Sequence, residues 1–418
     1  MNVGDNFDLI CASLESVKHV LMAFGFILAA GTVCSVLAHK LKIPDVVIFL
    51  IVGLLLGPDA TGMINIRVES ALNQLVLIFG SCYLLFDGGA SLRFNVLKDV
   101  WITIVTLATV GVLITAAITS VAAYYILGIP YIVALLLGTI IASTDPATLV
   151  LIFRQIKIRD RVAQTVMSES AFNDAVAAIV TFAVLGIAMG HGDFSLSIAL
   201  KDLFKQTLFG LIIGSVLGYL AAFLISHEKF GFLQKYAPVV SLMAVIGAYL
   251  GADGLHASGF MTVFVFGIVI GNKGFFGFVM EREEQEKLAD YVMTTSLIMR
   301  MFIFILLGTQ VDFALMNRYL FGGVAVVAVF MLLARPVTVF ICALPDRRAK
   351  WTIKEMLFMC WTRETGVIPG ALAGLMVGIG APEAKMIASV TFIAILMTII
   401  IQATTTRWLA NKLGLLDD

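Results

Sequence analysis

Two neighbouring stretches, ASTDPATLVLIF (residues 142–153) and SESAFNDAVAAIV (residues 168–180), place acidic side chains inside apolar sequence. Asp145, Glu169 and Asp174 lie where a helix would cross a bilayer, and a charged residue there costs about 2.5–3.5 kcal/mol on insertion scales. Pro146 follows the first acid directly, and a proline removes one helical hydrogen bond and frees a carbonyl. The two stretches therefore predict an interrupted membrane helix whose polar groups serve a function.

The rest of the chain has the composition of a polytopic helical membrane protein. Its 418 residues are 60% hydrophobic and 13% charged, against roughly 25% charged residues in a soluble domain. No long polar segment separates or follows the apolar runs, so we expect a single transmembrane unit without a soluble domain. Hydropathy predicts thirteen spans, at residues 20–38, 43–57, 72–86, 99–126, 130–153, 161–189, 203–226, 236–252, 257–271, 287–308, 319–344, 352–378 and 384–410.

The basic residues orient these spans. With the N-terminus outside, nineteen of the 28 Lys and Arg residues fall on the cytoplasmic side, six fall outside and three lie within spans. This bias predicts a cytoplasmic-membrane protein with its C-terminus inside. An odd number of spans also fits two inverted six-helix repeats joined by a linker helix, an arrangement common in secondary transporters.

A second interruption occupies the matching place in the second half. The twelfth span contains TRETGVIPG (residues 362–370), in which Pro369 again lies among small and polar residues. Irregular backbone at membrane depth is tolerated only where it faces protein or a wet cavity. The matched pair predicts that the two interrupted helices meet at a site near the bilayer midplane.

The residues around the first interruption are oxygen ligands. Ser170 and Asp174 are four residues apart and share a helix face that can meet Asp145, Thr144 and the carbonyls loosened by the proline. Hard oxygen ligands suit a hard cation. Two carboxylates in one low-dielectric site cannot both ionise cheaply, so a proton and a monovalent cation would compete for them. Such competition is the chemistry of exchange.

These stretches resemble the signature of monovalent cation/proton antiporters, most closely the electroneutral sodium/proton exchangers typified by archaeal NhaP proteins. The resemblance covers nearly the whole chain and includes four further segments, LKIPDVVIFLIVGLLLGP (41–58), LLFDGGASLR (84–93), FIFILLGTQVD (302–312) and LLARPVTVF (332–340). It implies crossed, interrupted helices and a homodimer in the bilayer. It also implies scaffold helices mainly in 1–98 and 203–308 and mobile core helices mainly in 99–189 and 319–418.

The resemblance also implies roles for individual residues. Asp174 is expected to bind the cation and the proton in turn, and Asp145, Ser170 and Thr144 are expected to help ligate Na⁺. Asn173 stands where electrogenic relatives carry a second aspartate, which implies exchange of one proton for one sodium ion.

Glu169 is expected to pair with a membrane arginine, and we favour Arg363 over Arg335 and Arg300. This arginine departs from the family pattern, because Thr365 holds the place directly before the glycine of the motif. We expect the neighbouring Glu364 at the cytosolic edge. Asp87 stands where a glutamate is common, and we expect its role to be structural.

The sequence predicts a Na⁺(Li⁺)/H⁺ antiporter, not an enzyme, with no cofactor and no nucleic-acid partner. The alternative on the same scaffold is a K⁺/H⁺ antiporter or a K⁺ efflux transporter. A membrane enzyme or receptor is the third possibility, but no catalytic Ser, His or Cys arrangement and no metal-ligand spacing supports it.

Overall fold

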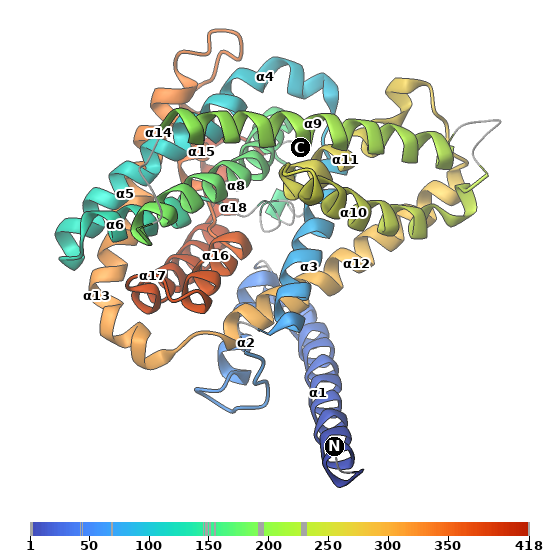
Figure 1. The fold of residues 1–418 in the computed structure, drawn as a ribbon. Helices are drawn as coiled ribbons and strands as arrows, with labels where there is room; N and C mark the ends of the chain where they lie inside the picture. Colours follow the sequence, from blue (N-terminus) through green and yellow to red (C-terminus); the bar gives the residue numbers. More distant parts are fainter. Residues whose placement is uncertain are drawn as a thin grey trace.

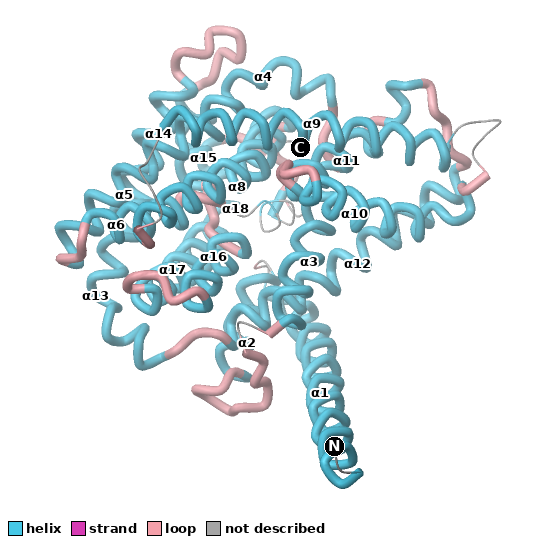
Figure 2. The backbone as a smooth tube through the Cα atoms, in the orientation of Figure 1, coloured by secondary structure: helices cyan, strands magenta, loops and turns pink. Residues whose placement is uncertain are grey.

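The computed structural model describes residues 3–41, 43, 45–67, 70–144, 146, 149, 152–153, 156–190, 196–226 and 232–416. This part of the chain is built from helices, joined by short loops (Figures 1 and 2). In chain order the α-helices are α1 (Val3–Leu41), α2 (Asp45–Leu56), α3 (Ala71–Ala90), α4 (Phe94–Thr106), α5 (Val112–Leu127), α6 (Tyr131–Ile141), α8 (Asp160–Ala188), α9 (Leu196–Ser226), α10 (Ala237–Gly254), α11 (Gly259–Gly271), α12 (Arg282–Thr309), α13 (Phe313–Val329), α14 (Arg335–Ala343), α15 (Ile353–Trp361), α16 (Val367–Gly378), α17 (Ala384–Met397) and α18 (Thr404–Leu413).

The predicted all-α membrane architecture is confirmed. Within the described ranges, nine helical stretches are long and apolar enough to cross a membrane, and α2, α6, α11 and α16 are shorter apolar helices. Twelve of the predicted spans coincide with one helix, with helices that continue into one another or, at the twelfth span, with two half-helices, and α6 occupies the first part of the fifth span, whose later part lies largely outside the described residues. The exact number of thirteen spans stays a prediction.

Both predicted interruptions are present. The fifth predicted span ends its first half-helix at Ile141, and residues 143–144 are not helical. The twelfth span divides into α15 and α16, separated by the non-helical residues 362–366. Interrupted backbone therefore occurs in the corresponding span of each half, as inverted repeats require.

Three wider turns were not predicted. The π-helices η1 (Leu107–Gly111) and η4 (Phe330–Ala334) join α4 to α5 and α13 to α14, in corresponding spans of the two halves. A third, η5 (Thr398–Ala403), joins α17 to α18. Such turns often mark functional sites. Hydropathy carries no signal for them, because one extra residue in a turn leaves the sequence uniformly apolar.

The helices pack in two groups. In one group α11 packs on α3 and α9, while α12 packs on α2 and α3. In the other group α5 packs on α6, α13 on α17, and α4 on α8. The contact between α2 and α12 is close enough to need glycine, since a Cβ on Gly308 would lie 2.8 Å from the Cα of Gly53. Figure 1 shows α1 extending away from both groups at its N-terminal end.

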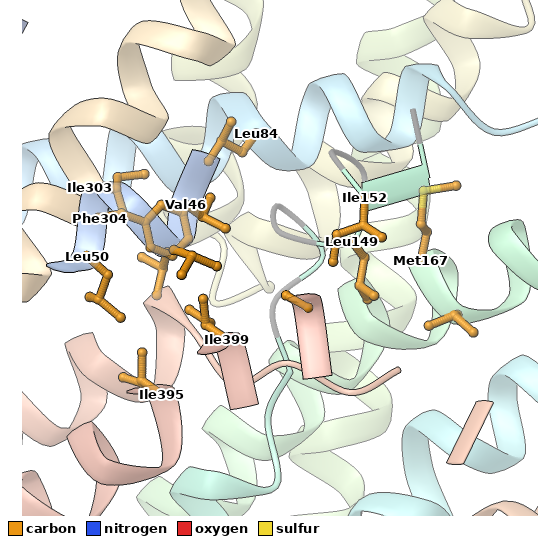
Figure 3. Close-up of a cluster of buried hydrophobic side chains, with 14 of the residues drawn as sticks. Val46, Leu50, Leu84, Leu149, Ile152, Met167, Ile303, Phe304, Ile395 and Ile399 are labelled. Carbon is orange, nitrogen blue, oxygen red and sulfur yellow. The ribbon is translucent and has the colours of Figure 1, made fainter. Parts of the chain in front are cut away.

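A buried apolar cluster lies where the two groups meet. Figure 3 shows side chains of α2, α3 and α12 beside side chains of α17 and η5, with residues 149 and 152 and Met167 of α8 nearby. The labelled members are Val46, Leu50, Leu84, Leu149, Ile152, Met167, Ile303, Phe304, Ile395 and Ile399. Met359 near the end of α15 and Val367 at the start of α16 belong to the same cluster, which therefore packs both sides of the second interruption.

Candidate ion-binding site

Asp174 lies at the centre of the site. It is on α8, its side chain is only 1% exposed, and the Ser143 hydroxyl donates a hydrogen bond to its Oδ1. Ser143 is in the non-helical segment that follows α6. A carboxylate that bonds to the broken end of another helix is held in one orientation. The sequence reasoning missed Ser143, although it stands next to Thr144 in the stretch that predicted the site.

Thr144 joins the site through two neighbours on α8. Its Oγ1 is 2.6 Å from the Ser170 Oγ and accepts a hydrogen bond from the Asn173 amide at 2.7 Å. Its backbone N–H donates to the Asn173 Oδ1 at 3.2 Å. The predicted residues Asp174, Ser170, Thr144 and Asn173 therefore come together, all buried. Asn173 satisfies both the main chain and the side chain of Thr144 and fixes the path of the interrupted backbone.

Asp145 lies outside the described residues, so its contact with Asp174 stays a prediction. Pro146, the next residue along, lines a small cavity together with Asp174. The cavity holds about 10 Å³, roughly the least that admits one water molecule. The polar side chains of its wall are Asp174 and Ser81, and the other lining residues are the apolar Leu84, Leu85, Val367 and Ile368.

Glu169 pairs with Arg335, and the favoured pairing with Arg363 is wrong. The guanidinium of Arg335 donates two parallel bonds to the carboxylate, Nη1 to Oε1 at 2.6 Å and Nη2 to Oε2 at 2.8 Å. Its Nε donates to the Met359 carbonyl at 2.9 Å. Both charged side chains are almost fully buried. This two-pronged geometry is the strong form of such a pair and ties α8 to α14 and α15.

Arg363 instead caps the first interrupted helix. It donates to the backbone carbonyl of Ala142 and, at 3.2 Å, to Thr115 Oγ1. In a continuous helix the carbonyl of Ala142 would bond the N–H of residue 146, and proline has none. A cation at the C-terminal end of a helix also complements its dipole. The arginine of the second interruption therefore satisfies the carbonyl that the first interruption frees.

The remaining predicted residues lie elsewhere. Arg300 is on α12, with its Nε 3.8 Å from Oδ2 of Asp45 at the start of α2, in the other helical group. The expectation that Glu364 lies at the cytosolic edge is wrong, because its side chain is 0% exposed. Asp87 is buried in α3. Thr365 donates its backbone N–H to Thr398 Oγ1 at 3.0 Å.

A large cavity leads toward Asp174 from one end of the bundle. It measures about 680 Å³ and is lined by the first half of α3, the second half of α8, the end of α10, the start of α11 and most of the length of α16. It shares two lining residues, Ser81 and Ile368, with the small cavity at Asp174. At the opposite end a cavity of about 470 Å³ contains His39, Asp45 and Arg407 and has no lining residue in common with the small one. Among the described residues, the small cavity at Asp174 therefore shares part of its wall with the larger cavity and none with the one at the opposite end.

Comparison with known proteins finds one family along nearly the whole chain. Residues 25–412 match the family described as "Sodium/hydrogen exchanger, transmembrane". Na(+)/H(+) antiporter 1 of Methanocaldococcus jannaschii is 31% identical, over 94% of this chain and 96% of that protein. The K(+)/H(+) antiporter NhaP of Alkalimonas amylolytica is 27% identical, over 95% of this chain and 68% of that protein. The structure of the sodium proton antiporter MjNhaP1 from M. jannaschii at pH 8 matches with a TM-score of 0.78 and 29% identity, over 94% and 99% of the two chains.

Proposed function

The chain belongs to the sodium/hydrogen exchanger family, and from this we propose that it exchanges Na⁺ (or Li⁺) for H⁺ across a membrane. Asp174 binds the two ions in turn. The observation that carries the proposal is the buried carboxylate of Asp174, which bonds the Ser143 hydroxyl at the broken end of α6. Relatives along nearly the full length are named Na⁺/H⁺ antiporters.

The chemistry of exchange follows from the neighbours of Asp174. A hydroxyl group donates one hydrogen bond and keeps two lone pairs, so Ser143, Thr144 and Ser170 can rotate to present oxygen to a cation. When the cation leaves, a proton can neutralise the carboxylate in its place, because an uncompensated charge is costly at such a buried position. The small cavity leaves room for one bound species at a time. One ion therefore displaces the other.

Alternating access requires that this site face each side of the membrane in turn. We assign residues 99–189 and 319–418 to the moving core and 1–98 and 203–308 to the scaffold, in a homodimer. The division follows the two packing groups of helices, and large apolar side chains are exposed along α1 and α9. With the N-terminus outside and the C-terminus in the cytoplasm, the larger cavity opens outward.

Exchange by the Asp174→Asn variant tests the proposal. Asparagine keeps the size of the side chain and its ability to accept the hydrogen bond from Ser143. Its neutral amide neither takes up a proton nor supplies the negative charge that balances a bound cation. In proteoliposomes the variant should give no sodium-driven pH change, whereas Asp160→Asn, an exposed acid on the same helix, should retain exchange. Normal exchange by Asp174→Asn ends the proposal.

A K⁺/H⁺ antiporter is the second candidate, because several relatives that match 94–95% of this chain carry that name. The oxygen ligands do not distinguish the two ions, since selectivity depends on the size and stiffness of the cavity. Parallel exchange assays with NaCl, LiCl and KCl separate the candidates. The proposal expects activity with the two smaller ions and little with potassium.

A further inference from the structure

Asp253 is the charged group of the large cavity that leads toward Asp174. Among the described residues that line this cavity it is the only charged one, and its polar companions, such as Asn73, Gln74 and Ser81, are neutral. Asp253 also lines a neighbouring cavity of about 340 Å³. The residue is exposed, and within the described ranges no cationic side chain forms an ion pair with it. Its negative charge is therefore open to ions that enter the cavity.

The end of α10 adds to the negative potential at this point. Asp253 lies in the last turn of the helix, which ends at Gly254 and has no basic residue in that turn. The carbonyl groups at the C-terminal end of a helix carry partial negative charge, so an acid there destabilises the helix, whereas a base would stabilise it. Asp253 therefore works against the stability of α10, and its charge and the helix dipole both attract cations to the same part of the cavity wall.

The cavity wall connects Asp253 to the exchange site. Tyr249, four residues before Asp253 and on the same face of α10, lines the large cavity with it. Ser81 of α3 and Ile368 of α16 belong both to this cavity and to the small cavity at Asp174. Between walls of low dielectric constant the field of a charge is stronger than in bulk water. A cation that reaches Asp174 through the large cavity therefore enters through the field of Asp253.

We propose that Asp253 recruits the transported cation, because its charge raises the concentration of monovalent cations in the large cavity and strengthens their binding at Asp174 without contact with the bound ion. The proposal rests on the exchange function, since it takes Asp174 as the site that sodium ions and protons share. Both ions carry one positive charge, so the potential of Asp253 favours both by the same factor. Asp253 therefore changes how tightly either ion binds, but not the ratio of the two affinities.

Few titratable groups face Asp253. The described residues that line the two cavities from α3, α8, α9, α11 and α16 are neutral, and α10 contributes the phenol of Tyr249. Asp174 itself lines the small cavity beyond. His256 is exposed and lines neither cavity. Its titration is the same in every variant compared, so it does not contribute to the difference between them.

Equilibrium binding of radioactive sodium to the purified full chain tests the proposal. The parent protein and Asp253→Asn are compared at an ionic strength of about 10 mM, where the Debye length is about 30 Å. At alkaline pH, where protons do not compete, the dissociation constant for sodium should be roughly threefold higher in the variant, a smaller factor than the tenfold or more of a fully charged cleft. In about 1 M N-methylglucamine chloride this difference should disappear, because the Debye length falls to about 3 Å.

The same measurement at mildly acid pH separates an electrostatic role from a structural one. There a proton must leave Asp174 before sodium binds. Because Asp253→Asn weakens proton binding and sodium binding by the same factor, the two effects cancel, and the apparent dissociation constant for sodium should be equal in the variant and the parent. A disturbed site would instead bind sodium more weakly at both pH values and at high ionic strength.

Glu383→Gln is the matched control, because Glu383 is an exposed acid in the loop between α16 and α17 and lines neither cavity. It should leave sodium binding unchanged, and Asp253→Glu should bind sodium as the parent does. The proposal is overturned if Asp253→Asn binds sodium like the parent at alkaline pH and low ionic strength, if its loss of affinity is the same under all conditions, or if Glu383→Gln has an equal effect. Failure of the exchange proposal would appear instead as normal transport by Asp174→Asn.

Discussion

Separating Glu169 from Arg335 should destabilise the protein more than any other single substitution at the site. The two side chains are 2% and 1% exposed, and two bonds of 2.6 and 2.8 Å join them. Removing one partner of such a pair leaves the other charge buried and uncompensated, at a cost of about 3–5 kcal/mol. We expect a loss of this size for Glu169→Gln and for Arg335→Met, measured by reversible unfolding in a mild detergent.

The double variant Glu169→Gln/Arg335→Met should lose less than the sum of the two single losses. It contains neither unpaired charge, so the coupling energy of the cycle should reach about 2–3 kcal/mol. The parallel cycle with Arg363→Met is the control. Arg363 bonds Ala142 and Thr115, so its coupling to Glu169 should stay below about 1 kcal/mol. Additive losses in the Arg335 cycle, or a larger coupling in the Arg363 cycle, would refute the assignment of the pair.

Three further outcomes are expected. Thr144→Val removes the hydroxyl oxygen that Ser170 and Asn173 contact. The sodium concentration for half-maximal exchange should rise roughly tenfold, which corresponds to the loss of about one hydrogen bond, and an unchanged concentration would contradict a role of Thr144 as a sodium ligand. Asn173→Asp adds a second acid beside Asp174. A membrane voltage imposed on the proteoliposomes should then drive proton movement in the variant and not in the parent protein, and equal proton movement in the two would remove the basis for one-to-one exchange. Gly308→Ala brings a Cβ to 2.8 Å from the Cα of Gly53 and should destabilise the folded protein by about 1–3 kcal/mol. Gly247→Ala is the control, because Gly247 has open space around it, and it should leave the stability unchanged. Similar melting temperatures of the two variants would show that α2 and α12 can move apart without loss of stability.

Helix positions and the two interruptions could be predicted because each depends on local sequence. An apolar run long enough to cross a bilayer must form a helix, since its backbone has no other hydrogen-bond partner. Pro146 and Pro369 mark where that bonding fails. The spacing of Ser170 and Asp174 placed both on one face of α8, and the structure brings both to the end of α6.

The arginine contacts could not be predicted in the same way. Arg363 lies two residues before the place that the family pattern gives the arginine, but residues 362–366 are not helical, so the direction of its side chain does not follow from a position around a helix. Arg335 follows the π-helix η4, whose wider turn changes the direction of the residues after it. The burial of Glu364 was not predicted for a related reason, because the unwound segment places four consecutive polar residues, 362–365, inside the protein.

The position of Arg363 follows from what the other half of the chain requires. Pro146 leaves the carbonyl of Ala142 without its helical partner, in a place where water is scarce, and an unbonded carbonyl there is costly. A long, permanently charged donor reaching across from the second interruption removes that cost and complements the dipole of α6. An unwound segment can deliver such a donor from more than one sequence position, because its backbone is not bound to a helical phase. In this chain Arg363, two residues away from the place in the family pattern, makes this contact with Ala142, and the contact joins the two interrupted helices.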